Sequence, residues 1–138
     1  MAETTLIEGS DHWVLPLVGE VVTQCGYDHA FTLLVGELAP SLEARIMHPF
    51  TLYYPEGTAE DFDPEGDPTD MAETLRLLRR TVTRSIAHND GRLEIDFDDG
   101  CLLRVPLSSQ YEVWTLTSMK RGVMLMSIGG GNLAVWSE

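Results

Sequence analysis

The chain has 138 residues, of which 43% are hydrophobic, and a formal net charge of −13. This size and apolar content are typical of a single globular domain with its own core, and they exclude both a disordered chain and two domains of ordinary size. The first 74 residues hold fifteen acidic and one basic side chain, whereas the remainder holds seven and eight. Such an acidic chain repels phosphate backbones, so nucleic-acid binding is not expected.

Strands dominate the first part of the chain, after a polar N-terminus, residues 1–10, that we expect to be loose. Runs of β-branched and aromatic residues between turn signals predict these strands, and Pro16 indicates that the first lies at a sheet edge. The predicted strands of this part are Trp13–Gly19, Val21–Tyr27, Ala30–Val35, Leu42–Met47 and Phe50–Tyr54.

The clearest helix signal lies in the middle of the chain. Asp67 suits an N-cap, because its carboxylate can accept from free backbone amides, and Pro68 suits the first helical position. Apolar residues recur at i, i+4 and i+7, namely Met71, Leu75 and Leu78. This spacing predicts an α-helix that buries one apolar stripe against a sheet.

A second strand-rich part follows the helix. Residues 89–91, Asn-Asp-Gly, are a strong hairpin signal, and the three glycines at 129–131 predict a last turn. The predicted strands are Thr81–Ala87, Arg92–Phe97, Cys101–Pro106, Tyr111–Thr117, Val123–Ile128 and Leu133–Trp136.

The two strand-rich parts correspond segment by segment, in the same order and with similar spacing. The matched segments are Val21–Gln24 with Thr81–Arg84, Phe31–Val35 with Leu93–Phe97, Leu42–Ile46 with Cys101–Val105, and Phe50–Tyr53 with Tyr111–Trp114. This predicts an internal duplication: an α+β fold, mainly antiparallel β, in which one central α-helix joins two similar β-meander units. Within a single domain, 11–138, the first unit is 11–57, the acidic loop and helix are 58–80, and the second unit is 81–138.

Several segments, taken together, carry a resemblance. They are Val22–Gln24, Pro49–Leu52, Asp63–Pro68, Phe97–Gly100, Tyr111–Leu116 and Gly129–Trp136. Their order resembles a family of small acidic bacterial proteins, common in actinobacteria and catalogued as a domain of unknown function, over roughly residues 19–136. The resemblance implies no activity, cofactor or catalytic residue. In size and charge the chain is also similar to the small acidic immunity proteins that neutralise bacterial toxins.

Four residues are candidates for a ligand site. Arg45 and Arg104 occupy matching places in the repeat, where they form either cross-strand ion pairs or an anion site, and we favour the ion pairs. Glu112 lies near Tyr111 and Trp114 in sequence and could be a tuned acid in an apolar pocket, but we favour a carboxylate that faces solvent or pairs with an arginine. The site hypothesis places these four residues around a pocket between the two units.

The carboxylates before the helix match the beginning of a calcium-binding loop motif, in which Gly66 takes the sixth position. These weak metal candidates are Asp61, Asp63, Glu65 and Asp67. The pattern then departs from the motif, because Ala72 stands at the twelfth place and prolines stiffen the segment. We therefore favour a plain acidic loop over Glu60–Asp70, and no cofactor is expected.

Other catalytic signals are weak. The chain has no Gly-x-Ser-x-Gly motif, and its four histidines, which we expect at surface turns, lack metal-ligand spacing: His12, His29, His48 and His88. Cys25 and Cys101 lie far apart, and the N-terminus has no basic start followed by an apolar core, so reduced thiols and a cytoplasmic location are expected. No apolar run reaches the roughly 18 residues of a membrane span.

These observations favour a non-enzymatic interaction domain whose acidic first half contacts a basic protein, for example an immunity-type antitoxin. The alternative is a small-molecule-binding or catalytic domain that uses a pocket between the two units. A homodimer through an open sheet edge is a further prediction, since no signal in the sequence closes the sheet.

Overall fold

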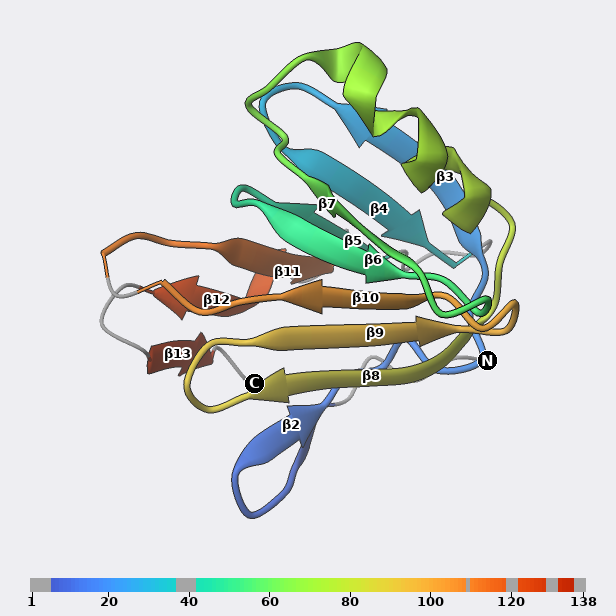
Figure 1. Ribbon diagram of the computed structural model, residues 1–138. Helices are drawn as coiled ribbons and strands as arrows, with labels where there is room; N and C mark the ends of the chain where they lie inside the picture. The colour runs from blue at the N-terminus through green and yellow to red at the C-terminus, as the bar shows by residue number, and fades with distance from the viewer. Residues whose placement is uncertain (1–5, 37–41, 109, 119–121, 129–131, 136–138) are drawn as a thin grey trace.

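The computed structural model describes residues 6–36, 42–108, 110–118, 122–128 and 132–135. In these residues two antiparallel sheets enclose one apolar core (Figure 1). The seven-stranded sheet has the order β1 (Ile7–Glu8), β2 (His12–Val14), β8 (Val82–His88), β9 (Leu93–Phe97), β10 (Leu102–Val105), β6 (Phe50–Tyr53) and β7 (Ala59–Phe62). The six-stranded sheet has the order β13 (Asn132–Val135), β12 (Gly122–Ile128), β11 (Trp114–Ser118), β5 (Leu42–Ile46), β4 (Phe31–Val35) and β3 (Val22–Tyr27). The expected fold class, α+β and mainly antiparallel β, is confirmed.

Alternating side chains decide which face of each strand is buried. In β9, Leu93, Ile95 and Phe97 point into the core, whereas Glu94 and Asp96 lie on the outer face. Strands β4, β5 and β11 show the same alternation of buried and half-buried residues. Because successive strand residues point to opposite faces, each sheet has one apolar inner face and one polar outer face.

A row of stacked aromatic rings connects the two sheets. Tyr27 stacks on Phe31 with ring centroids 5.1 Å apart, and Phe31 stacks on Phe50 at 5.3 Å. Phe50 in turn stacks on Phe62 at 5.5 Å. The row runs from β3 and β4 of one sheet to β6 and β7 of the other, and offset aromatic pairs of this kind add to the area they bury.

The segments that lead into β3 and β8 pair with each other in a symmetric way. The Val22 amide donates to the Arg80 carbonyl over 2.9 Å. The matching Val82 amide donates to the Glu20 carbonyl, also over 2.9 Å. Both strands then shift register directly after their first residue. Gly19 and Arg79, at matching places before the two strands, both have positive φ, 85° and 71°.

The expected meanders correspond to β3–β6 in the first half and β8–β11 in the second, and the last strand of each meander pairs with a strand of the other half. Strand β6 pairs with β10, and β11 pairs with β5. The two expected units, residues 11–57 and 81–138, are therefore not separate bodies, because each meander is completed by a strand from the other half. An internal duplication stays a proposal, supported by the matched bonds, register shifts and backbone angles around β3 and β8.

The expected helix is present as η1 (Pro68–Leu77), but it is a 3₁₀-helix rather than an α-helix. The Asp67 side chain caps it by accepting from the Thr69 amide over 2.9 Å. Its buried residues are Met71, Thr74 and Leu77. The expected stripe of Met71, Leu75 and Leu78 is wrong, since Leu75 is 53% exposed. With three residues per turn, a 3₁₀-helix aligns positions i, i+3 and i+6 instead.

This helix closes one side of the sandwich, beside β3 at the edge of the six-stranded sheet (Figure 1). The Tyr27 hydroxyl contacts the Thr74 hydroxyl and lies 3.4 Å from the Met71 carbonyl oxygen. At the other end of the helix, the Arg76 guanidinium lies 4.5 Å from the centre of the Tyr54 ring. The helix therefore links β3 with the end of β6 in the opposite sheet.

Three expectations about strands need correction. Ala59–Phe62 is strand β7, although Glu60–Asp70 was expected to be a loop. Within the N-terminus expected to be loose, Ile7–Glu8 pairs with β2. The expected strand Trp13–Gly19 ends at Val14, because residues 16–19 form a turn. The glycines at 129–131 and Trp136 lie outside the described residues.

Candidate functional site

The two matched arginines lie on the outer faces of opposite sheets and do not share a site. Arg45 projects outward from β5 and pairs with Asp28 over 3.0 Å. Arg104 projects outward from β10 and pairs with Asp96 over 2.7 Å. The apolar core fills the space between the sheets where the site hypothesis placed a pocket. The structure favours the ion-pair interpretation of both arginines.

Trp114 and Glu112 do not join either arginine. Trp114 is fully buried, and its Nε1 donates to the Gly91 carbonyl over 2.7 Å. Glu112 is exposed in the segment before β11. Trp114 therefore belongs to the core, and Glu112 faces solvent.

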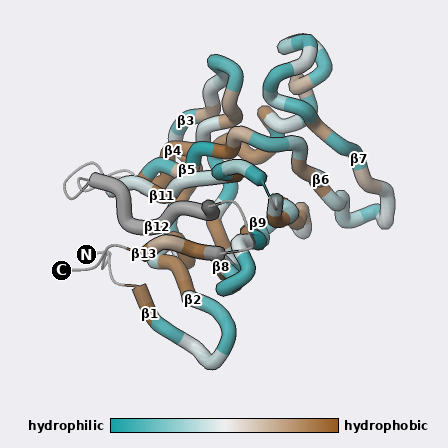
Figure 2. The backbone as a smooth tube through the Cα atoms, turned by 90° about the vertical axis from the view of Figure 1, so that its left-hand side faces the viewer, coloured by the Kyte–Doolittle hydropathy of each residue, from teal (hydrophilic) through white to brown (hydrophobic). Residues whose placement is uncertain are grey.

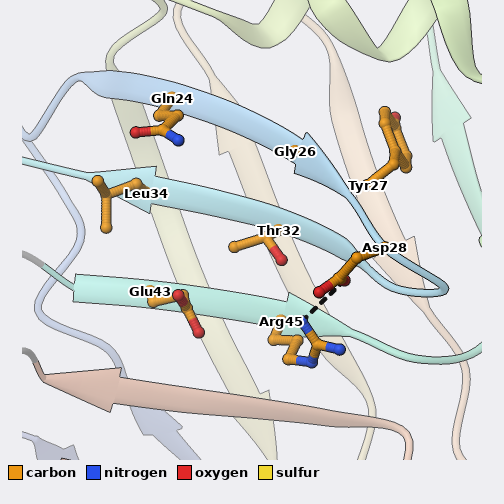
Figure 3. A pocket seen from close by; sticks show the side chains of 8 residues that line it. All are labelled: Gln24, Gly26, Tyr27, Asp28, Thr32, Leu34, Glu43 and Arg45. Carbon is orange, nitrogen blue, oxygen red and sulfur yellow. Dashed lines mark hydrogen bonds and ion pairs between the residues drawn. The ribbon is translucent and has the colours of Figure 1, made fainter.

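An open hollow of about 440 Å³ lies on the outer face of the six-stranded sheet (Figure 3). Strands β3, β4 and β5 form it, together with the turn between the first two. The residues that line this outer hollow are Gln24, Gly26, Tyr27, Asp28, Thr32, Leu34, Glu43 and Arg45. Of these, only Arg45 was a candidate from sequence. The signal that was available for the hollow is Gly26, a glycine inside a predicted strand.

A charge network lies on the outer face of the seven-stranded sheet, across β8, β9 and β10. Glu94 of β9 lies 2.7 Å from Arg84, 3.3 Å from His88 and 3.9 Å from Arg104. Asp96, two residues along the strand, pairs with the same two arginines. Burial alone would raise the pKa of Glu94, but the hydrogen bond from Arg84 and the nearby positive charges outweigh it and lower the pKa.

This network predicts how stability responds to acid. Because the pKa of Glu94 is lower in the folded state, its contribution is present above the usual glutamate value of about 4.3 and is lost as pH falls through the folded pKa. We expect Glu94→Gln to lower the free energy of unfolding by about 1–2 kcal/mol at neutral pH. The difference from wild type should shrink below about pH 4 in urea titrations. A difference that is constant with pH would contradict this account.

Three of the four weak metal candidates accept local hydrogen bonds through their carboxylates, and Glu65 contributes its backbone amide to one of these bonds. Asp61 accepts from the Thr51 hydroxyl over 2.6 Å, and Asp63 accepts from the Glu65 amide over 3.0 Å. Asp67 caps η1, and the hydrogen bond from the Thr69 backbone amide lowers its pKa. Among the described residues, no three His, Cys, Asp or Glu side chains are grouped as metal ligands. The calcium hypothesis thus finds no converging ligand set in this part of the chain.

Exposed acids dominate the chain from Glu56 to Glu73, which we call the acidic segment. It contains eight carboxylates and no Lys, Arg or His: Glu56, Glu60, Asp61, Asp63, Glu65, Asp67, Asp70 and Glu73. All are exposed except Glu60, which is half-buried and accepts from the Tyr54 hydroxyl over 2.9 Å. The segment includes β7, the last strand in the described seven-strand order, on the side of the molecule away from β1 and β13 (Figure 2).

The two thiols offer little nucleophilic chemistry, and the described histidines lie on strands as well as in turns. Burial raises the pKa of both Cys25 and Cys101 to about 11, which keeps them protonated at neutral pH. His12 and His88 are not turn residues as expected but partners on β2 and β8, with ring centroids 6.5 Å apart. His29, which does lie in a turn, has φ of 78°.

Of three comparisons with known proteins, one finds a match. A family model described as "Family of unknown function (DUF6188)" matches residues 13–137. Neither the curated proteins nor the solved structures include a match to the chain. In the described residues, no helix has the length and apolar character needed to cross a membrane.

Proposed function

The chain belongs to the family of unknown function (DUF6188), and from its geometry we propose that it is a protein-interaction domain that binds a basic partner through the acidic segment. The observation that supports this most strongly is the run of eight carboxylates without one basic residue, seven of them exposed. Exposed charge of one sign attracts partners of the opposite sign and speeds their encounter.

The position of the acidic segment also supports this role. Strand β7 pairs with β6 on one side, and no described strand pairs with its other side. Acidic side chains on an open edge deter pairing between two copies of the chain, because like charges would meet. They are compatible with a basic segment at the same edge. Binding and neutralising a basic toxin, as an immunity protein does, is one form of this proposal, whereas a homodimer through another open edge stays a prediction.

The test compares two variants with the same net charge. The segment variant carries Glu56→Gln, Glu65→Gln, Asp70→Asn and Glu73→Gln, which leave the Asp67 cap and the bonds of Glu60 and Asp61 intact. The control variant neutralises four carboxylates elsewhere through Glu8→Gln, Glu20→Gln, Asp98→Asn and Glu112→Gln. Proteins captured from the native host by the wild type are identified, purified and titrated against all three forms.

We expect the segment variant to bind a captured basic partner at least about tenfold more weakly than the wild type, since each lost charge contact contributes up to about 1 kcal/mol. The affinity of the control variant for the partner should stay within about threefold of the wild-type affinity, because its substitutions change only the long-range electrostatic field at the acidic segment. Equal losses in both variants would show that net charge alone governs binding and would overturn the proposal.

A further inference from the structure

Gly26 is the last but one residue of β3, on the outer face of the six-stranded sheet, where it pairs with Thr32. A glycine inside a strand reduces stability, so a structural reason for it is expected. Its φ lies outside the positive region that favours glycine, and an added Cβ would meet nothing within 4 Å. The register shift of β3 lies between Val22 and Gln24 rather than here. Neither backbone conformation, packing nor a bulge therefore requires glycine at this place.

A further reason for a glycine inside a strand is close approach by another molecule, and the surroundings of Gly26 fit one. Gly26 lines the outer hollow of about 440 Å³, a volume within the range of ligand sites. Side chains from three strands and one turn surround it (Figure 3). Thr32 offers a hydroxyl, and Leu34 offers an apolar contact beside it.

The charges around the outer hollow select a cation. Arg45 is already paired with Asp28 over 3.0 Å, so its charge is balanced. Glu43, two residues before Arg45 on the same face of β5, has no ion pair among the described residues. Two carboxylates thus stand against one guanidinium among the lining residues, and the half-buried Glu43, which has no ion pair in the described part of the chain, can accept from a cationic ligand.

We propose that the outer hollow receives an arginine or lysine side chain of the basic partner, an inference that rests on the proposed function. The Glu43 carboxylate accepts from the incoming cation, and the Thr32 hydroxyl adds a polar contact. The alkyl part of the side chain lies over Gly26, where the missing Cβ leaves room, and against Leu34. The Asp28–Arg45 pair forms the wall at one end of the hollow.

The direct test is an NMR titration of the ¹⁵N-labelled full chain with acetyl-arginine amide, which carries its only charge on the guanidinium. The uncharged acetyl-citrulline amide, of nearly the same shape, is the matched control ligand. We expect saturable shifts of the Gly26 and Thr32 amides with a dissociation constant on the order of millimolar for the arginine compound. The citrulline compound should bind at least about tenfold more weakly.

Two substitutions separate the site from the fold. Gly26→Phe fills the hollow without backbone strain, so its melting temperature should equal or exceed that of the wild type while the shifts at Thr32 disappear. Gly26→Ala leaves most of the space and should retain binding. Glu43→Gln should weaken binding at least about tenfold, whereas Glu112→Gln, exposed outside the hollow, should leave it unchanged.

The inference is overturned if acetyl-arginine amide causes no saturable shift at the outer hollow, or if it binds Gly26→Phe as it binds the wild type. It is also overturned if Gly26→Phe and Glu43→Gln bind the captured partner with wild-type affinity while the segment variant does not. In that last case the proposed function stands without this site. If, by contrast, the segment and control variants bind the partner equally, the proposed function itself is contradicted.

Discussion

Trp114→Ala is expected to lower the free energy of unfolding by about 3–5 kcal/mol, because it leaves a large cavity in a close-packed core. Trp114 is fully buried on β11, and its Nε1 bonds the Gly91 carbonyl over 2.7 Å. The substitution removes both the indole volume and the partner of that buried carbonyl. Urea denaturation monitored by circular dichroism measures the change, and a variant too unstable to fold would agree with it.

The control for this prediction is Glu112→Gln, two residues earlier and exposed. It should change the free energy of unfolding by no more than about 0.5 kcal/mol. If Trp114→Ala lowered stability by less than about 1 kcal/mol, the residue would not belong to the core as described. Such a result would favour the sequence-based hypothesis that Trp114 faces a ligand.

Leu77→Ala is expected to lower the free energy of unfolding by about 2–5 kcal/mol, the range for a leucine removed from a core. Leu77 is fully buried at the end of η1, whereas Leu75 is 53% exposed. Leu75→Ala should therefore change stability by no more than about 0.5 kcal/mol. The same denaturation measurement on the two variants, two residues apart, reports which side of the helix faces the core.

The order of the two leucine effects distinguishes the 3₁₀-helix from the α-helix expected from sequence. An α-helix with its stripe on Met71, Leu75 and Leu78 predicts the larger loss for Leu75→Ala. The 3₁₀-helix, with Met71, Thr74 and Leu77 buried, predicts the larger loss for Leu77→Ala. A larger loss for Leu75→Ala would contradict the structure of this segment.

The strands were predictable because alternation is a local property of the sequence. In β9, the repeat of apolar and acidic residues from Leu93 to Phe97 identifies both the strand and its buried face. Strand β7 was not predicted, because its local sequence lacks this alternating signal. Its sequence, Ala-Glu-Asp-Phe, has few strand-forming residues, and pairing with β6 outweighs that weak propensity.

The helix register could not be predicted because it depends on a contact distant in sequence. Thr74 reads as a polar residue beside an apolar stripe, yet it is buried, and the hydroxyl of Tyr27, 47 positions earlier, contacts its hydroxyl. The Thr74 hydroxyl also donates to the Met71 carbonyl over 2.6 Å. Buried polar groups need such partners, and periodicity carries no information about them.

The candidate site was predictable only in part, because strand partners decide which residues meet. The matching places of Arg45 and Arg104 were visible in sequence, but not that β5 and β10 belong to different sheets and hold these arginines on opposite outer faces. The outer hollow unites residues from β3, β4 and β5 that are neighbours only after pairing. Gly26 was the one local sign of it.

The central claim, that the acidic segment binds a basic partner, is tested most directly by measuring the affinity of the captured partner across ionic strength. From about 50 to 500 mM salt, the wild-type dissociation constant should rise at least about tenfold, because salt screens exposed charge contacts. The control variant should follow the wild type, and the segment variant should bind weakly with a much flatter salt dependence. A wild-type affinity that does not change with salt, or an equally steep dependence in the segment variant, would contradict the claim.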